Sequence, residues 1–171
     1  MTFEEAGLNL EDIMKMNNCS IKQIYHKLRG SFNKVSWRRV VCSNVGCPRW
    51  TVILTLIAHG KLYTKDRLSK WGIQIDQECV LCRKKNETVQ HLFFECSYAA
   101  ELWGNLQNWQ VIRRPIYGWS EELAWAEKWL KRQNARTELY KMALAACVYY
   151  VWQERNTRIF QDKVRRCEVL G

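Results

Sequence analysis

The chain has 171 residues, 47% of them apolar and nine of them tryptophan, and a formal net charge of +10. This length corresponds to one domain, or to one domain with an appended helical layer, and the apolar content can build a core. The apolar runs are far shorter than the ~20 residues that span a bilayer, which argues against a membrane protein.

Patterns typical of helices dominate the sequence. There are only two prolines and eight glycines. Alternation of the strand type is scarce, and no internal repeat stands out. This composition predicts an all-α fold.

The N-terminal part is expected to contain a leader and two short helices. Residues 1–18 are interpreted as a flexible leader without the apolar run of a secretory signal. A helix is expected from Ser20, which forms a capping-box pattern with Gln23 and is followed by Gly30 as a stop. Ser36 is expected to cap a second helix, whose apolar residues are Trp37, Val40 and Val41.

Two further helices are expected before residue 75. Pro48 fits the first turn of one helix, which ends at Gly60. Thr64 is expected to cap the next helix, which should bury Leu68 and Trp71 and stop at Gly72. The apolar stripe of the first of these helices has the i, i+3, i+4 spacing of a core-facing side and consists of Trp50, Ile53, Leu54, Ile57 and Ala58.

Positive charge is concentrated between residues 13 and 75. This window holds twelve lysines and arginines and a single acid, Asp66. Such a block attracts polyanions over a Debye length of about 8 Å at physiological salt, and nucleic acid is the obvious partner. The alternative is a solvated basic surface that only aids solubility.

A Cys-x2-Cys-x8-His-x4-Cys pattern follows, formed by Cys79, Cys82, His91 and Cys96. Four soft ligands within a short segment suit one tetrahedral zinc ion, and four protein ligands leave no coordination position open. The pattern therefore predicts one structural Zn²⁺. We expect short capped helices around this Cys-Cys-His-Cys zinc knuckle, followed by a C-terminal helical pair.

Two alternatives to zinc remain open for these cysteines. They could be unrelated buried thiols beside a surface histidine, or they could form disulfides. A chain made in a reducing compartment favours metal over disulfide. The other five cysteines have no comparable spacing and are interpreted as free thiols: Cys19, Cys42, Cys47, Cys147 and Cys167.

Three more helices are expected after the knuckle. Ser97 is expected to cap the first of them, and residues 113–115 are interpreted as a linker. Ser120 should start the next helix. The last and longest begins around residues 134–137 and runs to about Val164, with one side formed by Leu139, Met142, Ala143, Ala146 and Tyr150. The expected division is therefore a leader (1–18), a zinc-binding domain (19–108) and a C-terminal helical segment (116–166).

Residues 20–103 carry an ordered series of motifs. They are SIK (20–22), PRW (48–50), LYTKDRL (62–68), WGI (71–73) and ETVQHLFFEC (87–96). The ordered set resembles the zinc-binding domain found C-terminal to the reverse transcriptase of plant LINE-type (non-LTR) retrotransposons. The tail VWQERN (151–156) with RIF (158–160) resembles the helical segment that follows it in those elements. Cys42 departs from the family, which usually has tryptophan there.

The resemblance implies a non-catalytic piece of a larger polyprotein. The sequence contains no Tyr-x-Asp-Asp polymerase motif and no endonuclease, and no carboxylate cluster of the kind that two-metal catalysis needs. We therefore expect no enzymatic activity and no small-molecule substrate. The expected location is intracellular, with the nucleus suggested by the life cycle of such elements.

The resemblance also implies that the knuckle helps to hold RNA or target DNA. Arg83, Lys84 and Lys85 lie between the second and third ligands, where zinc would hold them rigid for contacts to phosphate. Lys61, Lys65, Arg67 and Lys70 are candidates to widen this surface. For each single lysine, the alternative is an ordinary solvated residue.

Aromatic residues leave a second choice open. Phe93 and Phe94 could stack on bases, but their position between two ligands favours packing, as for Trp50, Trp71 and Trp103. The rival interpretation of the whole chain is a zinc-stapled scaffold that docks onto a protein such as the polymerase body. A third is a retroelement fragment without a selected function.

Overall fold

The computed structural model describes residues 22, 25, 35, 37–42, 46–130 and 134–161. The chain divides into two units, Met1–Val35 and Ser36–Gly171, and nearly all the described residues lie in the second. The expected leader (1–18) lies outside the described residues. So does all but Lys22 and Tyr25 of the helix expected from Ser20.

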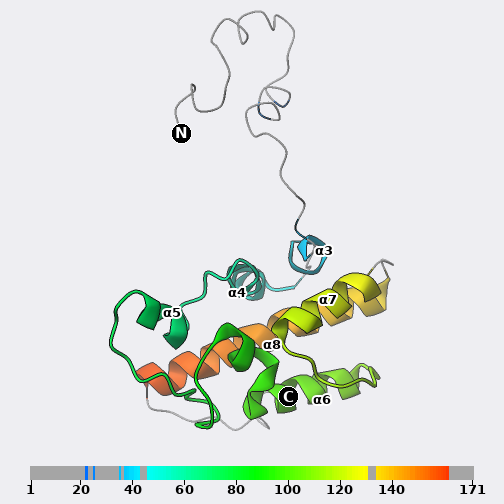
Figure 1. The fold of residues 1–171 in the computed structure, drawn as a ribbon. Helices are drawn as coiled ribbons and strands as arrows, with labels where there is room; N and C mark the ends of the chain where they lie inside the picture. Colours follow the sequence, from blue (N-terminus) through cyan, green and yellow to red (C-terminus); the bar gives the residue numbers. More distant parts are fainter. Residues whose placement is uncertain are drawn as a thin grey trace, which may run out of the picture. The chain divides into compact units, whose positions relative to one another are not determined.

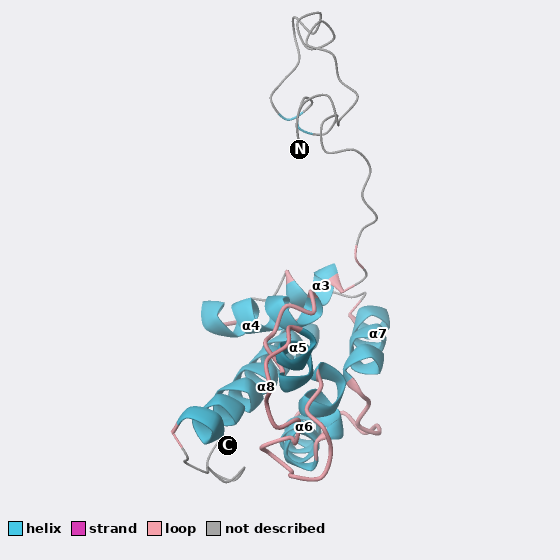
Figure 2. Cartoon of the chain, turned by 60° about the vertical axis from the view of Figure 1, so that its left-hand side comes forward, coloured by secondary structure: helices cyan, strands magenta, loops and turns pink. Residues whose placement is uncertain are grey.

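The described part of the chain is helical and contains no strand. One isolated antiparallel bridge pairs Glu78 with Asn86. These findings confirm the predicted all-α fold (Figures 1 and 2). In chain order the elements are α3 (Arg38–Val41), α4 (Pro48–Ala58), α5 (Lys65–Lys70), the irregular turn η2 (His91–Glu95), α6 (Ser97–Trp109), α7 (Trp119–Trp129) and α8 (Ala135–Phe160).

Helix α8 is the central element of the second unit. It packs against α4 and α6, and also against α3 and η2, as Figure 1 shows for its orange ribbon between α4 and α6. Its start is fixed by a capping box, in which the Asn134 side chain accepts from the Thr137 N–H at 2.9 Å and the Thr137 hydroxyl accepts from the Asn134 N–H at 3.0 Å. The final helix therefore packs within its own chain, while the expected boundary between residues 108 and 116 remains a prediction.

The buried side of α8 is offset from the expected apolar side, with which it shares Ala143. Leu139 is 38% exposed, whereas the neighbouring Tyr140 is fully buried. The helix also ends at Phe160, before the expected end near Val164, a residue that is not described. The core-facing residues also have i, i+3, i+4 spacing, but this pattern is shifted by one position toward the C-terminus relative to the expected side. These residues are Tyr140, Ala143, Leu144, Cys147, Val148 and Val151.

Most expected helix boundaries lie within one residue of the observed ones. Pro48 begins α4, and Gly60 and Gly72 follow α4 and α5 with left-handed backbone at φ +61° and +82°. The N-cap of α3 is Trp37, and the expected cap Ser36 lies outside the described residues. The N-cap of α6 is Cys96 and that of α7 is Gly118, so Ser97 and Ser120 lie inside their helices.

The segment expected to be a linker (113–115) is anchored in the core. Arg114 forms a buried salt bridge with Glu122 of α7, and its guanidinium lies 3.9 Å from the ring centroid of Trp125. Tyr140 of α8 donates to the same carboxylate. Burial and the adjacent Glu122 raise the pKa of Tyr140 well above its ordinary value. The loop thus ties α7 to α8.

Candidate metal centre

The first two cysteines lie in a tight turn of the knuckle, residues 78–86. The Cys79 N–H donates to the Lys85 carbonyl at 2.9 Å, and the Arg83 N–H donates to the Cys79 carbonyl at 2.8 Å. Arg83 has φ +53°, which reverses the chain directly after Cys82. This turn brings the two sulfurs to one side, which a Cys-x2-Cys pair requires if it is to bind one ion.

The other two ligands need a break in the helix between them. In an unbroken α-helix, His91 and Cys96 would lie about 140° apart around the axis, because each residue turns by about 100°. The break comes at Phe93 (φ −102°, ψ 101°) and Phe94 (φ 86°, ψ −22°). The Cys96 N–H still donates to the His91 carbonyl at 2.7 Å, so both side chains can face the knuckle.

The four ligand atoms converge, because all of them lie within 4.8 Å of one another. The Cys79 and Cys96 sulfurs are 3.9 Å apart, and the Cys82 sulfur is 3.2 Å from His91 Nε2. A tetrahedral zinc ion, with bonds of about 2.3 Å to sulfur and about 2.0 Å to nitrogen, separates its ligand atoms by about 3.5–3.8 Å. The cluster therefore fits one zinc ion, with Cys79, Cys82, His91 and Cys96 as its ligands.

The sulfurs of Cys79 and Cys96 are buried and share a hydrogen bond. That bond lowers the pKa of the Cys79 thiol to about 4, and the Cys82 and Leu81 N–H groups add to the effect. The same bond, with burial, raises the pKa of Cys96 well above its ordinary value. A zinc ion bound by both thiolates would replace this hydrogen bond.

The His91 side chain is buried. Its Nε2 faces the Cys82 sulfur, whereas its Nδ1 is buried and has no hydrogen-bond partner among the described residues. Metal-bound histidines usually donate through their second nitrogen. Here the Thr88 hydroxyl accepts from the backbone N–H of His91 at 3.0 Å and so anchors the residue that carries the ring.

Comparison with protein families agrees with this geometry. Residues 19–103 match the family model described as zinc-binding in reverse transcriptase. This segment belongs to that family. No curated protein and no solved structure gives a significant match to the chain. The domain is a zinc-binding one and not a catalytic one, in agreement with the closed ligand set.

The reverse-transcriptase zinc-binding domain is braced by a helix from outside the matched segment. Arg158 of α8 donates to the Leu81 carbonyl at 3.0 Å and to the Val80 carbonyl at 3.4 Å, both in the knuckle. Its guanidinium also pairs with Glu154 at 2.8 Å and lies 5.0 Å from the ring centroid of Tyr98. The C-terminal helix therefore positions the loop that carries the first two ligands.

A buried carboxylate joins three parts of the domain. Glu87 accepts from Arg155 Nη2 of α8 at 2.7 Å and from the Lys65 N–H, at the start of α5, at 2.9 Å. In the sequence, Glu87 stands out only as a motif position, and Arg155 and Arg158 only as parts of the tail. A clue was available in Arg155 and Arg158, two charged residues on a helix that otherwise carries an apolar face.

The basic residues expected to bind nucleic acid divide into two groups. Arg83, Lys84 and Lys85 are exposed in the knuckle loop, and Lys61 and Lys70 are also exposed. Arg67 is half-buried, with its guanidinium 5.1 Å from the ring centroid of Trp71.

Lys65 does not belong to this surface. Its side chain is 6% exposed, and its ammonium donates to the Glu78 carbonyl at 2.7 Å and pairs with Asp76 at 3.6 Å. The expectation for Lys65 was wrong, because a lysine at the first position of α5 extends its side chain under the knuckle and supports it.

The aromatic residues also divide. Phe93 and Phe94 are buried, and Phe94 lies 5.4 Å from Trp103 between ring centroids, so the packing interpretation is confirmed. Trp103 is fully buried and Trp50 packs against the core. Trp71 is 55% exposed, so its expected burial was wrong. The short α5 ends one residue earlier and turns this ring outward at its C-cap.

The remaining described cysteines lie apart from the ligand cluster. Cys42 and Cys47 are exposed, and Cys147 is buried in α8. Cys19 and Cys167 lie outside the described residues. These three described cysteines form no disulfide.

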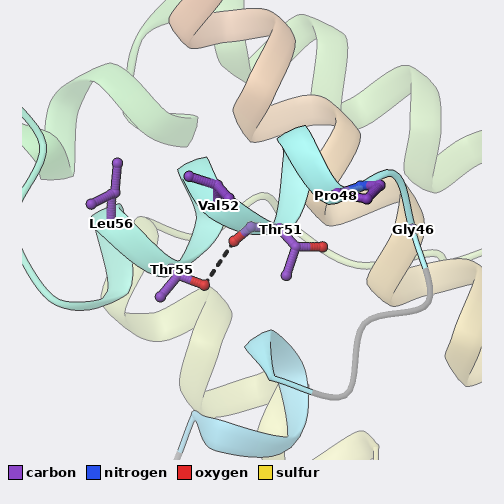
Figure 3. Close-up of a pocket in the computed structure, with 6 residues that line it drawn as sticks. All are labelled: Gly46, Pro48, Thr51, Val52, Thr55 and Leu56. Carbon is purple, nitrogen blue, oxygen red and sulfur yellow. Dashed lines mark hydrogen bonds between the residues drawn. The ribbon is translucent and has the colours of Figure 1, made fainter.

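A shallow hollow of about 500 Å³ lies over α4 and is shown in Figure 3. Its six lining residues carry no titratable side chain, and the Thr55 hydroxyl is occupied by donating to the Thr51 carbonyl at 2.7 Å. The hollow can therefore accept an apolar group, but it offers no catalytic chemistry. It is lined by Gly46, Pro48, Thr51, Val52, Thr55 and Leu56.

Proposed function

We propose that the chain is a nucleic-acid-binding module without catalytic activity, built on one structural zinc ion and derived from a LINE-type retroelement reverse transcriptase. The observation that carries this proposal is the basic loop, Arg83, Lys84 and Lys85. These three cations are exposed between the second and third ligands of a closed four-ligand cluster. A closed cluster leaves zinc no position for substrate, so its role is to hold the fold.

Rigidity makes the basic loop suitable for phosphate. The Cys79–Lys85 backbone hydrogen bond and the Glu78–Asn86 bridge close the loop at its base. A loop that is already ordered loses little conformational entropy on binding. Contacts from lysine and arginine to phosphate add affinity that depends on salt and not on sequence. We therefore propose binding to RNA or DNA without sequence preference.

Salt titration tests the proposal. Log affinity for a labelled oligonucleotide should fall linearly with log salt, as measured by fluorescence anisotropy. Replacing Arg83, Lys84 and Lys85 by alanine should weaken binding to all sequences alike and reduce the slope by about three units, roughly one per lost phosphate contact. The matched control removes three exposed charges elsewhere, through Arg113→Ala, Lys128→Ala and Arg136→Ala.

Two results would contradict the proposal. One is the absence of measurable binding even at low salt. The other is an equal loss of affinity in the basic-loop variant and in the control, which would mean that net charge alone is responsible.

The proposed ancestry has a separate test in the genome, where a polymerase reading frame upstream of this sequence is expected. A nuclear location of the tagged chain is part of the same proposal.

A second candidate function is docking onto a protein, such as the body of a reverse transcriptase. The observation that favours it is the outward face of α4, where Val52 is 56% and Leu56 is 37% exposed beside the hollow of Figure 3. Val52→Glu with Leu56→Glu should abolish such docking and leave nucleic-acid affinity unchanged.

None of the described helices is both long and apolar enough to cross a membrane.

A further inference from the structure

Two aromatic side chains flank helix α5 and face solvent. Tyr63 is 57% and Trp71 is 55% exposed. Their ring centroids lie 5.5 Å apart, with the planes at 65° to each other. Large aromatic rings usually supply core packing or binding energy. An exposed pair in contact therefore requires an explanation other than the core, and we call Tyr63 and Trp71 the aromatic patch.

Positively charged residues neighbour the aromatic patch along the chain. The Arg67 guanidinium lies 5.1 Å from the Trp71 ring centroid, within the range of a cation–π interaction. Lys61 and Lys70 are exposed on either side of it in the sequence. The one acid in this segment, Asp66, accepts from the Thr64 hydroxyl at 2.6 Å and pairs with Lys70 at 3.8 Å. Three cations against one acid leave the segment positive.

The patch is held in place by the zinc-binding domain. The Lys65 N–H donates to the buried Glu87, and the Lys65 ammonium donates to the Glu78 carbonyl of the knuckle. At the other end of α5, Gly72 adopts φ +82° and the Ile73 N–H donates to the Leu68 carbonyl at 3.2 Å. The residues that carry both rings therefore adjoin an anchored helix. Binding of a ligand would cost little conformational entropy for ordering these rings.

Two other exposed rings, those of Trp109 and Phe160, lack this setting. Trp109 is 67% and Phe160 is 76% exposed. Neither has a ring or cation partner among the described residues. Scattered single apolar residues are normal on a protein surface. The combination of paired rings, flanking cations and an anchored helix thus distinguishes the aromatic patch from them.

We propose that the aromatic patch binds unpaired bases of a single-stranded nucleic acid, with Lys61, Arg67 and Lys70 contacting the adjacent phosphates. Every base has a π face, so stacking on Trp71 and Tyr63 is tolerant of sequence, and the cations follow the backbone. In duplex DNA the bases are stacked on one another and cannot reach the rings. The inference rests on the proposed function and deepens it by naming the single strand as the preferred form.

The test compares single-stranded and duplex probes of about 12 nucleotides, a length within the usual site size. Oligouridylate, oligothymidylate and a mixed-sequence duplex are titrated by fluorescence anisotropy against the zinc-loaded chain. Trp71→Ala is expected to weaken binding of both single strands by roughly five- to 100-fold, and duplex binding by less than about twofold. Trp109→Ala is the matched control and should change neither.

A second variant guards against misfolding. Trp71→Phe keeps a ring for stacking and should retain single-strand affinity within a few-fold. It should lose the part of the intrinsic fluorescence quenching that an oligonucleotide causes by stacking on the exposed indole of Trp71. Quenching that is unchanged in Trp71→Phe would overturn the inference. So would single-strand affinity in Trp71→Ala equal to that of the natural chain.

The outcomes separate this inference from the proposed function. If the natural chain binds no nucleic acid at low salt, the proposed function fails and the inference fails with it. If the basic-loop variant loses affinity while Trp71→Ala does not, the proposed function stands and the aromatic patch is excluded. Loss of single-strand and duplex binding in equal measure by Trp71→Phe would also exclude it, since stacking cannot act on a duplex.

Discussion

At the scale of single residues, backbone strain is concentrated at the metal ligands. Of the three described residues other than glycine with positive φ, Arg83 follows the ligand Cys82 and Phe94 precedes Cys96 by two positions. A bulky residue in the left-handed region costs on the order of 1–3 kcal/mol and persists only where its surroundings impose it. Here the strained residues turn the ligands toward one point. Burial of the Phe94 ring and, when bound, zinc can offset this cost.

The ligand assignment is tested one sulfur at a time. Cys82→Ser should reduce the zinc content of the purified protein, measured by elemental analysis, from about one ion per chain to well below it, because three remaining ligands bind zinc less tightly. Cys42→Ser is the matched control, since Cys42 is exposed and lies outside the cluster. If Cys82→Ser retains a full zinc ion, Cys82 is not a ligand.

At the scale of elements, the sequence predicts those structural features that depend only on residues close together in the chain. The Pro48 start, the Gly60 and Gly72 stops and the ligand spacing are local features, and each has its expected place. The buried side of α8 depends on how α4 and α6 meet it, and a long helix with apolar residues on several sides leaves this choice open. The apolar residues of this helix therefore predict one apolar side, which includes Leu139 and leaves out Tyr140.

Contacts across long sequence separations were the least predictable part of the site. Arg158 donates to a carbonyl 77 positions earlier, and Arg155 meets Glu87 across 68 positions. Nothing in the spacing of these residues indicates their partners. The same limit explains Lys65 and Trp71, since burial of one and exposure of the other follow from where the short α5 sits against the knuckle.

The brace from α8 leads to a prediction for zinc retention. Arg158→Ala removes the donor to the Leu81 and Val80 carbonyls and the partner of the nearly buried Glu154. Supporting residues around metal ligands typically change affinity by about 10- to 100-fold. We therefore expect the zinc affinity of Arg158→Ala to fall by about 10- to 100-fold, as measured by transfer of zinc to a chromophoric chelator. The free energy of unfolding should fall by about 2–4 kcal/mol.

Arg136→Ala provides the control for this experiment, because Arg136 is an exposed arginine near the start of the same helix. Arg158→Lys keeps the charge but not the forked donor, so it should recover only part of the loss. Zinc transfer from Arg158→Ala at the rate of the natural chain would show that α8 does not support the knuckle.

At the scale of the whole molecule, the zinc centre and the helical core are not independent. Structural zinc can contribute on the order of 10 kcal/mol to a small domain. Here the family-matched segment (19–103) shares its core with α8, which also supplies Arg158 to the knuckle and Arg155 to Glu87 beside it. Metal binding in the middle of the chain and packing of its last described helix therefore stabilise each other. Removal of zinc should disorder the knuckle before it unfolds the helices.

The end of the core remote from zinc gives a prediction about pH. Tyr140 is buried and donates to Glu122, which also pairs with Arg114, and its pKa in the folded chain is raised well above 10. The unfolded chain has the ordinary value of about 10. The folded state thus keeps a proton that the unfolded state loses. The stability that this proton provides is complete below about pH 10 and declines above it, by about 1.4 kcal/mol per pH unit.

Comparison of the natural chain with Tyr140→Phe isolates the pH dependence due to Tyr140. The lysines titrate in both chains, so their contribution cancels. At neutral pH the variant should be less stable by about 1–3 kcal/mol, because Glu122 loses a buried donor. The difference between the natural chain and Tyr140→Phe, measured by urea unfolding from about pH 7 to 11, should stay constant to about pH 10 and then shrink. Parallel curves throughout that range would mean that Tyr140 ionises equally in the folded and unfolded states. The burial of the Tyr140 side chain does not allow this, because its ring and hydroxyl contact Arg114, Glu122, Trp103, Trp125 and Trp129.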